Sequence, residues 1–424
     1  MKYPQILSTI YSRDGKSSNF TLDRVREAAA GIGNPQDRFR ALHVAGSNGK
    51  GSVAKMVVEV LGRSGFKTAL FTSPHVHRYT ERIRIGGREI PKKEVIRRFN
   101  RIEQARLEGK IPWITFFEIT TLIAFDWFAD MKVDLAVVEV GLGGRLDATN
   151  ICHSIVDVIT TIGIEHTKVL GSTIRQIAGE KAGIIKGPAP VICGKLPTAA
   201  LKRISRRASA KRADLKRLGK DFIVRENGDG TFDYRGSRLR LDGLRNSLRG
   251  RHQVRNAAVC CAALEELMDL GYAVKPRMIA PALREVTWEG RLETLSKKPE
   301  VIIDCAHNVP AVKALVKELD GRKYHLVFGA LGDKPIEKMF GMLRPFTRRA
   351  YVSSPDVHRS ISPREIGARC GARAYDSVSA AMDAAVRDAR KSGLPVLVTG
   401  SVFVVAEARE HYLKLENVDP PIAS

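Results

Sequence analysis

The sequence predicts an α/β protein in which a doubly wound, mostly parallel sheet domain precedes a smaller, Rossmann-like α/β domain. A chain of 424 residues is too long for one typical core, so two domains are expected. Strand-like and helix-like stretches alternate to about residue 285, which is the pattern of parallel sheets. The alternation restarts beyond Trp288, and the polar stretch 289–300 is the expected join. The domains are therefore predicted at residues 1–290 and 291–424.

Local patterns place the individual elements. In the first domain we expect strands at 40–45, 68–71 and 133–140, helices at 50–64 and 116–131, and a hairpin at 83–90. The hairpin is centred on Gly86-Gly87, since two glycines supply the positive φ of a tight turn. The nearly continuous apolar run at 133–140 is typical of a strand buried on both faces. In the second domain we expect strands at 301–304, 325–329, 350–353 and 396–399, and a helix at 310–319.

Composition limits the class of protein. No apolar stretch reaches the roughly 18 to 20 residues that span a bilayer, and the first residues lack the layout of a signal peptide. The six cysteines have neither metal-ligand spacing nor a CxxC pair, so we expect reduced thiols in a cytoplasmic protein. No membrane partner is predicted.

The net charge of +24 admits three interpretations: binding of nucleic acid, attraction of small anions, or a basic solvated surface. The densest basic run lies between Lys202 and Lys220. It has no interleaved aromatic residues and no recognised nucleic-acid motif, so we interpret it as a solvated helix face and expect no nucleic-acid partner.

A glycine-rich turn between a strand and a helix is the first candidate site. It comprises Gly46, Ser47, Asn48, Gly49, Lys50, Gly51 and Ser52. Glycines let backbone N–H groups point inward, and the start of a helix favours bound anions. Lys50 can reach phosphates and Ser52 can hold Mg²⁺. The first domain is therefore predicted to contain a P-loop, although only two residues separate Gly46 from Gly49-Lys50.

Glu139 ends the buried apolar strand and is the second candidate. Ligands of open α/β sheets gather at the carboxyl ends of the strands, so a carboxylate there is a natural Mg²⁺ ligand. His166 also follows an apolar strand, and its position favours a metal ligand over a structural histidine. From composition alone, Lys181 would be an ordinary surface lysine.

These motifs together resemble the folylpolyglutamate synthase/dihydrofolate synthase family of the Mur ligase superfamily. The resemblance covers nearly the whole chain. It rests on HVAGSNGKGS (43–52), TSPHVHRYTERIRI (72–85), TFFEITT (115–121), EVGLGGRLDATN (139–150), IGIEH (162–166), EKAGIIK (180–186), GRHQVRNAA (250–258), DCAHN (304–308) and TGSVFVVAEAR (399–409). Two departures are visible: Ser47 replaces the usual Thr, and Val309 stands where Pro usually follows the DCAHN motif.

The resemblance implies ATP and two Mg²⁺ ions. By motif match, Ser52, Ser73 and Glu139 hold one ion, and Glu139, His166 and a carbamylated Lys181 hold the other. Carbamylation turns a cationic amine into an anionic oxygen ligand, which suits a hard cation. The need for a monovalent cation stays open.

The resemblance also implies the roles of residues further along the chain. Asn256 matches the adenine contact, and Arg291 matches a residue that reaches the phosphates. Asp304 and His307 match positions on the ATP and glutamate side, as does Ser401. Arg82 falls in a substrate-facing motif, and Phe117 and Asp147 match positions that contact the pterin.

The implied activity is ATP-dependent addition of L-glutamate to dihydropteroate or a (tetrahydro)folate through an acyl phosphate, by a monomer. Phe117 and Asp147 favour an enzyme that uses both acceptors. Polyglutamylation alone, or ligation to another pterin, is the alternative within the family. From other classes, a nucleic-acid-stimulated P-loop ATPase and a non-catalytic paralogue are the competing hypotheses.

Overall fold

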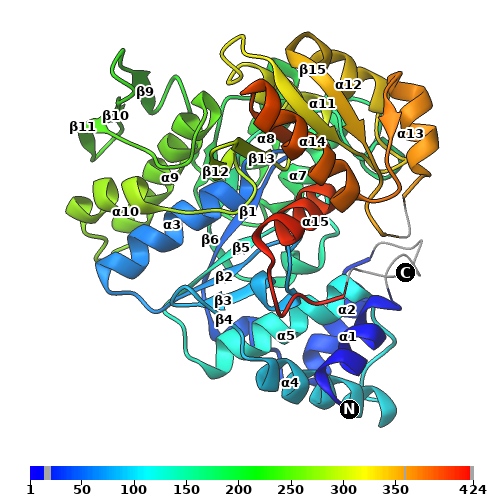
Figure 1. Cartoon of the computed structure of the whole chain (residues 1–424). Coiled ribbons are helices and arrows are strands. Elements are labelled where there is room, and N and C mark those ends of the chain that lie inside the picture. The colour runs from blue at the N-terminus through cyan, green and yellow to red at the C-terminus, as the bar shows by residue number, and fades with distance from the viewer. Residues whose placement is uncertain (14–20, 358–359, 421–424) are drawn as a thin grey trace. The chain divides into compact units, whose positions relative to one another are not determined.

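The structure is a computed structural model, and it describes residues 1–13, 21–357 and 360–420. The chain forms two compact units (Figure 1). Unit 1 contains Met1–His75, Tyr79–Ser247 and Gln253–Val286. Unit 2 contains Val76–Arg78, Leu248–His252 and the chain from Thr287 onward. Two short segments that precede Thr287 in the sequence are thus part of unit 2.

An eight-stranded sheet organises unit 1. Its order is β4-β3-β2-β5-β1-β6-β7-β8. The strands are β1 (Ala41–Ala45), β2 (Thr68–Phe71), β3 (Ile83–Ile85), β4 (Arg88–Glu89), β5 (Leu135–Glu139), β6 (Ser154–Ile159), β7 (Val191–Cys193) and β8 (Leu215–Arg217). All neighbours run parallel except the pairs that involve β3 and β4. Every residue of β1 and β5 is buried, because helices cover both faces.

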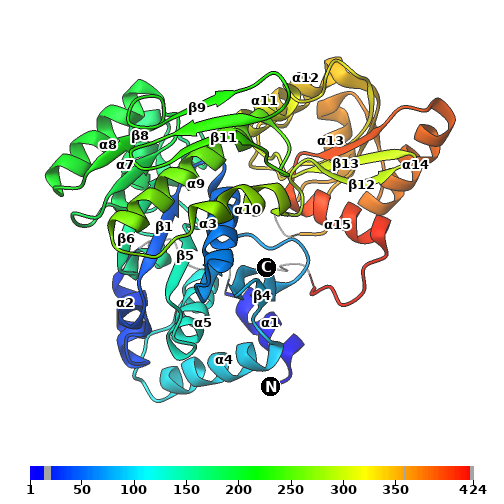
Figure 2. The ribbon, with the colours of Figure 1, turned by 90° about the vertical axis from the view of Figure 1, so that its left-hand side faces the viewer.

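The helices of unit 1 form separate groups. α3 (Lys50–Ser64) packs on β1, β2 and β5, with α10 (Ile279–Glu285) against it. α9 (Arg251–Asp269) lies beside them in Figure 2. α5 (Phe116–Asp130) contacts α1 (Tyr3–Tyr11), α2 (Asp23–Gly31) and α4 (Lys92–Leu107). α6 (Thr167–Leu170) and α8 (Thr198–Ala210) pack against α7 (Ile174–Lys181).

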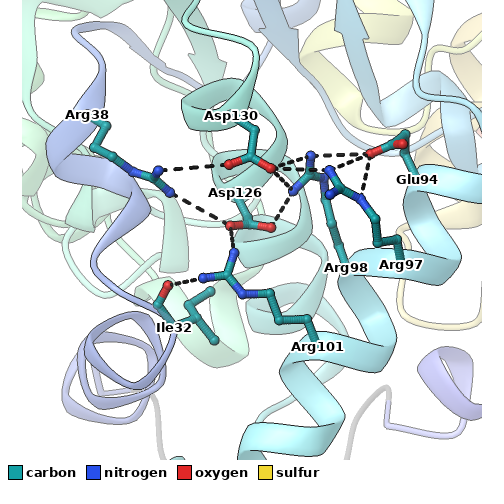
Figure 3. Close-up of polar contacts among 8 residues, drawn as sticks. All are labelled: Ile32, Arg38, Glu94, Arg97, Arg98, Arg101, Asp126 and Asp130. Atoms are coloured by element: carbon teal, nitrogen blue, oxygen red, sulfur yellow. Dashed lines mark hydrogen bonds and ion pairs between the residues drawn. The ribbon is translucent and has the colours of Figure 1, made fainter.

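A dense ion-pair network, drawn in Figure 3, joins α4 to α5. Asp126 and Arg98 are almost completely buried and pair with each other. Arg98 also reaches Asp130 at 3.1 Å, and Arg101 bonds both Asp126 and the carbonyl of Ile32, the latter at 2.8 Å. Glu94, Arg97 and Arg38 complete the network at its rim. Buried charges need such multiple partners to offset desolvation.

Two features of unit 1 differ from expectation. Residues 223–244 form an antiparallel three-stranded sheet, β9 (Ile223–Glu226), β10 (Phe232–Arg235) and β11 (Arg240–Leu244), within the region expected to alternate strands and helices. The basic run 202–220 is helical only to Ala210, after which it forms a turn and β8. Lys202, Arg203 and Arg206 are exposed on α8, so the prediction of a solvated helix face fits only the first half of the run.

Unit 2 has a six-stranded sheet of order β12-β13-β17-β14-β15-β16. The strands are β12 (Glu293–Lys297), β13 (Glu300–Asp304), β14 (Tyr324–Phe328), β15 (Thr347–Val352), β16 (Arg373–Ala374) and β17 (Val396–Thr399). Only the β12–β13 pair is antiparallel. One face packs on α14 (Val378–Ser392) and α15 (Val402–Leu413). α11 (Val309–Val316), α12 (Ile336–Leu343) and α13 (Pro363–Cys370) enclose the core of the other face.

The start of α11 shows what the substitution at position 309 does. The helix begins at Val309, and the side chain of Asn308 caps it by accepting a hydrogen bond from the Ala311 N–H at 2.9 Å. Pro310 occupies the first helical turn, where a missing N–H costs nothing. The departure from the family pattern therefore leaves the helix start intact.

Most predicted elements agree with the structure to within one to three residues at each end. The polar stretch 289–300, where the join was expected, forms β12 and the turn to β13. All six cysteines are free and buried. Within the described ranges, every helix is too short or too polar to span a lipid bilayer.

Candidate active site

The turn between β1 and α3 has the backbone geometry that an anion-binding loop needs. Gly49 is the N-cap of α3 with φ of 88°, and a Cβ there would lie 2.6 Å from Asn256 Oδ1. Glycine has no side chain to cap the helix, so the first N–H groups of α3 are left for an anion. The loop is held in place because Ser47 and Asn48 donate backbone hydrogen bonds to Thr161, of 2.8 and 3.0 Å.

Lys50, Glu139 and Lys181 converge on this loop. The Nζ atoms of Lys50 and Lys181 each donate to the carbonyl of Gly46 at 3.0 Å. Lys50 Nζ also lies 3.9 Å from Glu139 Oε1. The strands explain the meeting, because β5 lies beside β1 with Glu139 next to Val44. Two cations and a carboxylate thus share the carboxyl edge of the sheet.

Ser73 bonds Glu139, and Ser52 lies in the first turn of α3. The Ser73 N–H donates to Glu139 Oε2 at 3.1 Å. Ser52 Oγ accepts a 3.3 Å bond from Gln253 Nε2, and Gln253 Oε1 accepts from Asn256 at 2.9 Å. Gln253 is therefore a supporting residue that the sequence motifs alone did not single out.

Glu165 is a second residue missed from the sequence. Its Oε1 lies 2.8 Å from Lys181 Nζ, and both side chains are largely buried. Burial and the nearby charge of Lys50 lower the pKa of Lys181, against the opposite effect of Glu165. The pKa of Glu165 is lowered although burial opposes it, because Lys181 and Lys50 favour the carboxylate. Its place beside His166 was the available signal.

His166 directly follows Glu165 and lies at the N-cap of α6 with φ of 46°. Its side chain is exposed, unlike those of Glu139 and Lys181. The conformation is left-handed, which is uncommon for histidine and marks a constrained turn.

Phe117, Asp147 and Arg82 belong to the same unit. A Cβ on Gly141 would lie 2.4 Å from the Phe117 ring, so the loop after Glu139 packs closely on that ring. Asp147 is buried and accepts from the Leu142 N–H at 2.7 Å. Burial raises the pKa of Asp147 against these hydrogen bonds. Arg82 donates from Nε to His75 Nδ1 at 2.7 Å and lies over the ring of Phe116 at 5.1 Å.

Unit 2 gathers its four predicted residues around the ends of β13 and β17. Asp304 ends β13 and accepts from the N–H groups of Leu292 and Ala306, both at 3.0 Å. Burial raises the pKa of Asp304, against the charges of Arg291 and His252. Two residues past β17, Ser401 caps α15 through the Phe403 N–H at 3.2 Å. His307 Nδ1 lies 2.9 Å from the Cys305 carbonyl.

The donor atoms suit Mg²⁺ held together with a phosphate ligand. No group of three or more His, Cys, Asp or Glu side chains in the described part of the chain is arranged to hold a metal by itself. Mg²⁺ is commonly held by one or two carboxylates together with substrate phosphates and water. Glu139, with Ser52 and Ser73 near the phosphate loop, fits that pattern.

Comparison with known proteins identifies the family. Residues 44–264 match the Mur ligase middle domain, and residues 290–402 match the Mur ligase glutamate ligase domain. The chain is 32% identical to the dihydrofolate synthase/folylpolyglutamate synthase of Bacillus subtilis over 92% of this chain and 94% of that protein. It is 34% identical to the Escherichia coli protein of the same name, over 95% and 94%. The folylpolyglutamate synthase of Lacticaseibacillus casei is 31% identical over 97% and 99%.

Solved structures agree with the sequences. Escherichia coli FolC in complex with DHPP and ADP matches with a TM-score of 0.90 at 32% identity, and 98% of each chain is covered. The Mycobacterium tuberculosis folylpolyglutamate synthase complexed with ADP also gives 0.90, at 30% identity over 98% and 99%. This chain therefore belongs to the folylpolyglutamate synthase/dihydrofolate synthase family, within the Mur ligase superfamily.

Proposed function

We propose that this chain is an ATP-dependent ligase that adds L-glutamate to dihydropteroate and to (tetrahydro)folates. The main support for the proposal is that Lys50 and Lys181 both bond the Gly46 carbonyl and that Glu139 lies beside Lys50. This is the charge arrangement needed beside transferring phosphate. In the proposal residues 1–290 bind ATP and residues 291–424 act as the glutamate-ligase domain. The relatives named for both activities support a bifunctional enzyme.

The chemical difficulty is that a carboxylate is a poor acylating agent. Transfer of the γ-phosphoryl group of ATP gives an acyl phosphate, the glutamate amine attacks its carbonyl, and phosphate leaves from the tetrahedral intermediate. Lys50 stabilises charge on the transferring group, and the N–H groups at the start of α3 hold the phosphates. Asn256 contacts the adenine, and the phosphates are surrounded by Gly46, Asn48, Gly49, Gly51 and Ser52.

Two Mg²⁺ ions would neutralise charge on the phosphates and draw the two anionic reactants together. We place one with Ser52, Ser73 and Glu139, and one with Glu139, His166 and carbamylated Lys181. The lowered pKa of Lys181 supports carbamylation, which requires the neutral amine. The modification would exchange the ion pair with Glu165 for an anionic oxygen ligand.

Substrates are assigned to the remaining residues. Arg82, Phe117 and Asp147 recognise the acceptor, and the close packing of the Phe117 ring on Gly141 and the buried carboxylate of Asp147 support this role. Arg291 and Asp304 bind ATP, and His307 and Ser401 bind glutamate. In this proposal the enzyme is a cytoplasmic monomer.

One assay tests the function and separates its alternatives. Purified protein with ATP, Mg²⁺ and radiolabelled glutamate is offered dihydropteroate or tetrahydrofolate, and the products are separated by mass. Labelled product from both acceptors is expected. Product from tetrahydrofolate alone would favour polyglutamylation only, the activity for which the Lacticaseibacillus casei relative is named. ATP hydrolysis that requires DNA or RNA instead would contradict the proposal.

A further inference from the structure

A buried chain of hydrogen bonds runs from the central strand of the sheet to Asp147. His43 lies in the middle of β1, and its Nε2 atom is 2.9 Å from Oγ1 of Thr149. Thr149 Oγ1 donates to Asp147 Oδ1 at 2.5 Å, and the Thr149 N–H donates to the same oxygen at 3.0 Å. His43 and Thr149 have no exposed surface, and Asp147 is 6% exposed. Solvent therefore does not compete for these bonds.

The direction of each bond follows from counting hydrogens. The Thr149 hydroxyl has one hydrogen, and an ionised carboxylate can only accept. The hydroxyl hydrogen thus points to Asp147, and Thr149 Oγ1 must accept from His43. This requires a hydrogen on Nε2 of His43.

The surroundings of the imidazole favour the same tautomer, with the hydrogen on Nε2. Nδ1 of His43 is buried and has no hydrogen-bond partner among the described residues. A hydrogen on Nδ1 would be a buried unsatisfied donor, which costs more than a missing bond at an acceptor. Burial, aided by the charge of Lys186, lowers the pKa of His43 well below its ordinary value. The ring is therefore neutral, with its single hydrogen on Nε2.

At the far end of the chain, both oxygens of Asp147 are held by hydrogen bonds. Oδ1 receives both Thr149 donors, whereas Oδ2 receives the Leu142 N–H at 2.7 Å. A carboxylate offers about four acceptor positions, and the Gly141 N–H also bonds this one. The Thr149 bonds at Oδ1, together with these backbone donors, set the orientation in which Asp147 presents Oδ2.

We propose that His43 is a positioning residue that acts through Thr149 to orient the Asp147 carboxylate toward N–H donors of the acceptor heterocycle. The proposal rests on the proposed function, in which Asp147 recognises the pterin. It adds specificity determinants at His43 on β1 and at Thr149 on the 3₁₀ turn Ala148–Ile151.

Kinetics of paired variants test this role. Thr149→Val removes the hydroxyl at nearly constant shape, whereas Thr149→Ser keeps it. His43→Leu removes the donor, and His43→Gln keeps an N–H near the Nε2 position. We expect the KM for dihydropteroate to rise about 10-fold or more in Thr149→Val and His43→Leu, and about 2-fold or less in the conservative variants. The KM values for ATP and glutamate, and kcat, should change by less than about 3-fold.

A matched control separates positioning from packing. His325 is another buried histidine at a strand, β14 of unit 2, hydrogen-bonded by Tyr351 and Ser392. His325→Leu should lower stability without a selective change in the acceptor KM. Equal losses in Thr149→Ser and Thr149→Val, or equal rises in all three KM values, would overturn the proposal.

The hydrogen position gives a test that needs no turnover. ¹⁵N-labelled histidine NMR on the full chain should show His43 with a protonated Nε2 and an unprotonated Nδ1, assigned by its loss in His43→Gln. The opposite tautomer would refute the chain of bonds even in an active enzyme. A wild-type protein that fails to use any pterin acceptor would instead refute the proposed function, and the positioning role with it.

Discussion

Unit 1 contains two dense clusters of charge that differ in how the charges are held. In the α4–α5 network every carboxylate lies against two or more arginines, and the partners sit on regular helices (Figure 3). At the sheet edge, Lys50 and Lys181 donate to one carbonyl oxygen, Lys50 lies 3.9 Å from Glu139, and Lys181 pairs with Glu165 at 2.8 Å. The first cluster consists of side chains that pair with one another, whereas the lysines of the second also converge on the backbone of a loop.

Charge density alone therefore does not indicate a site. The cluster at the sheet edge lies at the carboxyl ends of parallel strands, where backbone N–H groups and a left-handed glycine also converge. The network lies on the outer helices and consists of groups that satisfy one another. Variants in the two clusters should therefore fail in different ways: one in turnover, the other in stability.

The largest effect is expected at Lys50. Lys50→Ala should lower kcat by at least about 10³-fold, equivalent to roughly 4 kcal/mol, because it removes the main cation beside the transferring phosphate. The unfolding midpoint in urea should change little. Glu139→Ala should likewise abolish turnover and leave the fold intact. Lys55→Ala, one turn further along α3 and paired with Glu59, is the control and should stay active. Near-normal turnover in Lys50→Ala would count against the mechanism.

Asp126→Ala tests the other cluster. It leaves Arg98 buried without its closest partner and removes the carboxylate bonded to Arg101. Losing one member of a buried ion pair costs about 3 to 5 kcal/mol, so the free energy of unfolding should fall by that amount in urea titrations. The kcat of the remaining folded protein should match wild type. A stable but inactive variant would mean that the two clusters are functionally linked.

The contrast also explains what the sequence could predict. The phosphate loop and Glu139 stand directly after apolar strands, so strand ends and glycine spacing suffice to predict that they meet. The roles of Lys181 and Asp147 were inferred only from the family resemblance. A lysine in a helix, for example, has no distinguishing local pattern. Glu165 and Gln253 were missed since their partners, Lys181 and Ser52, are 16 and 201 residues away in sequence. The α4–α5 network was likewise beyond prediction, because a charged helix face is ordinarily solvated.

Asp157 is a buried carboxyl that, unlike those of the α4–α5 network, has no arginine cluster around it. Burial raises its pKa to about 7, although the charge of Lys186 opposes the shift. The folded protein keeps this proton up to about pH 7, whereas the unfolded chain releases it near pH 4. The free energy of unfolding should therefore fall as the pH rises from about 4 to 7 and stay lower above that.

Asp157→Asn should remove this dependence. Relative to wild type, the free energy of unfolding of the variant should rise by roughly 1 to 4 kcal/mol between pH 4.5 and pH 8. The upper figure corresponds to a pKa difference of about three units. Urea unfolding of both proteins at the two pH values measures the gain. Equal pH dependence in the two proteins would show that Asp157 is ionised in the fold or already compensated.

The smallest effect is expected at the rim of the network, where Arg97 is 60% exposed beside Glu94 and Asp130. Arg97→Ala should lower the free energy of unfolding by about 0.5 kcal/mol or less, because exposed ion pairs lose in desolvation and side-chain entropy most of what they gain. The loss should shrink further in 0.5 M salt, where exposed charges are screened. Asp126→Ala, measured in parallel, should keep most of its larger loss in salt, because Arg98 is buried. If both losses disappeared equally in salt, the network would be a surface cluster, and its contrast with the sheet edge would no longer hold.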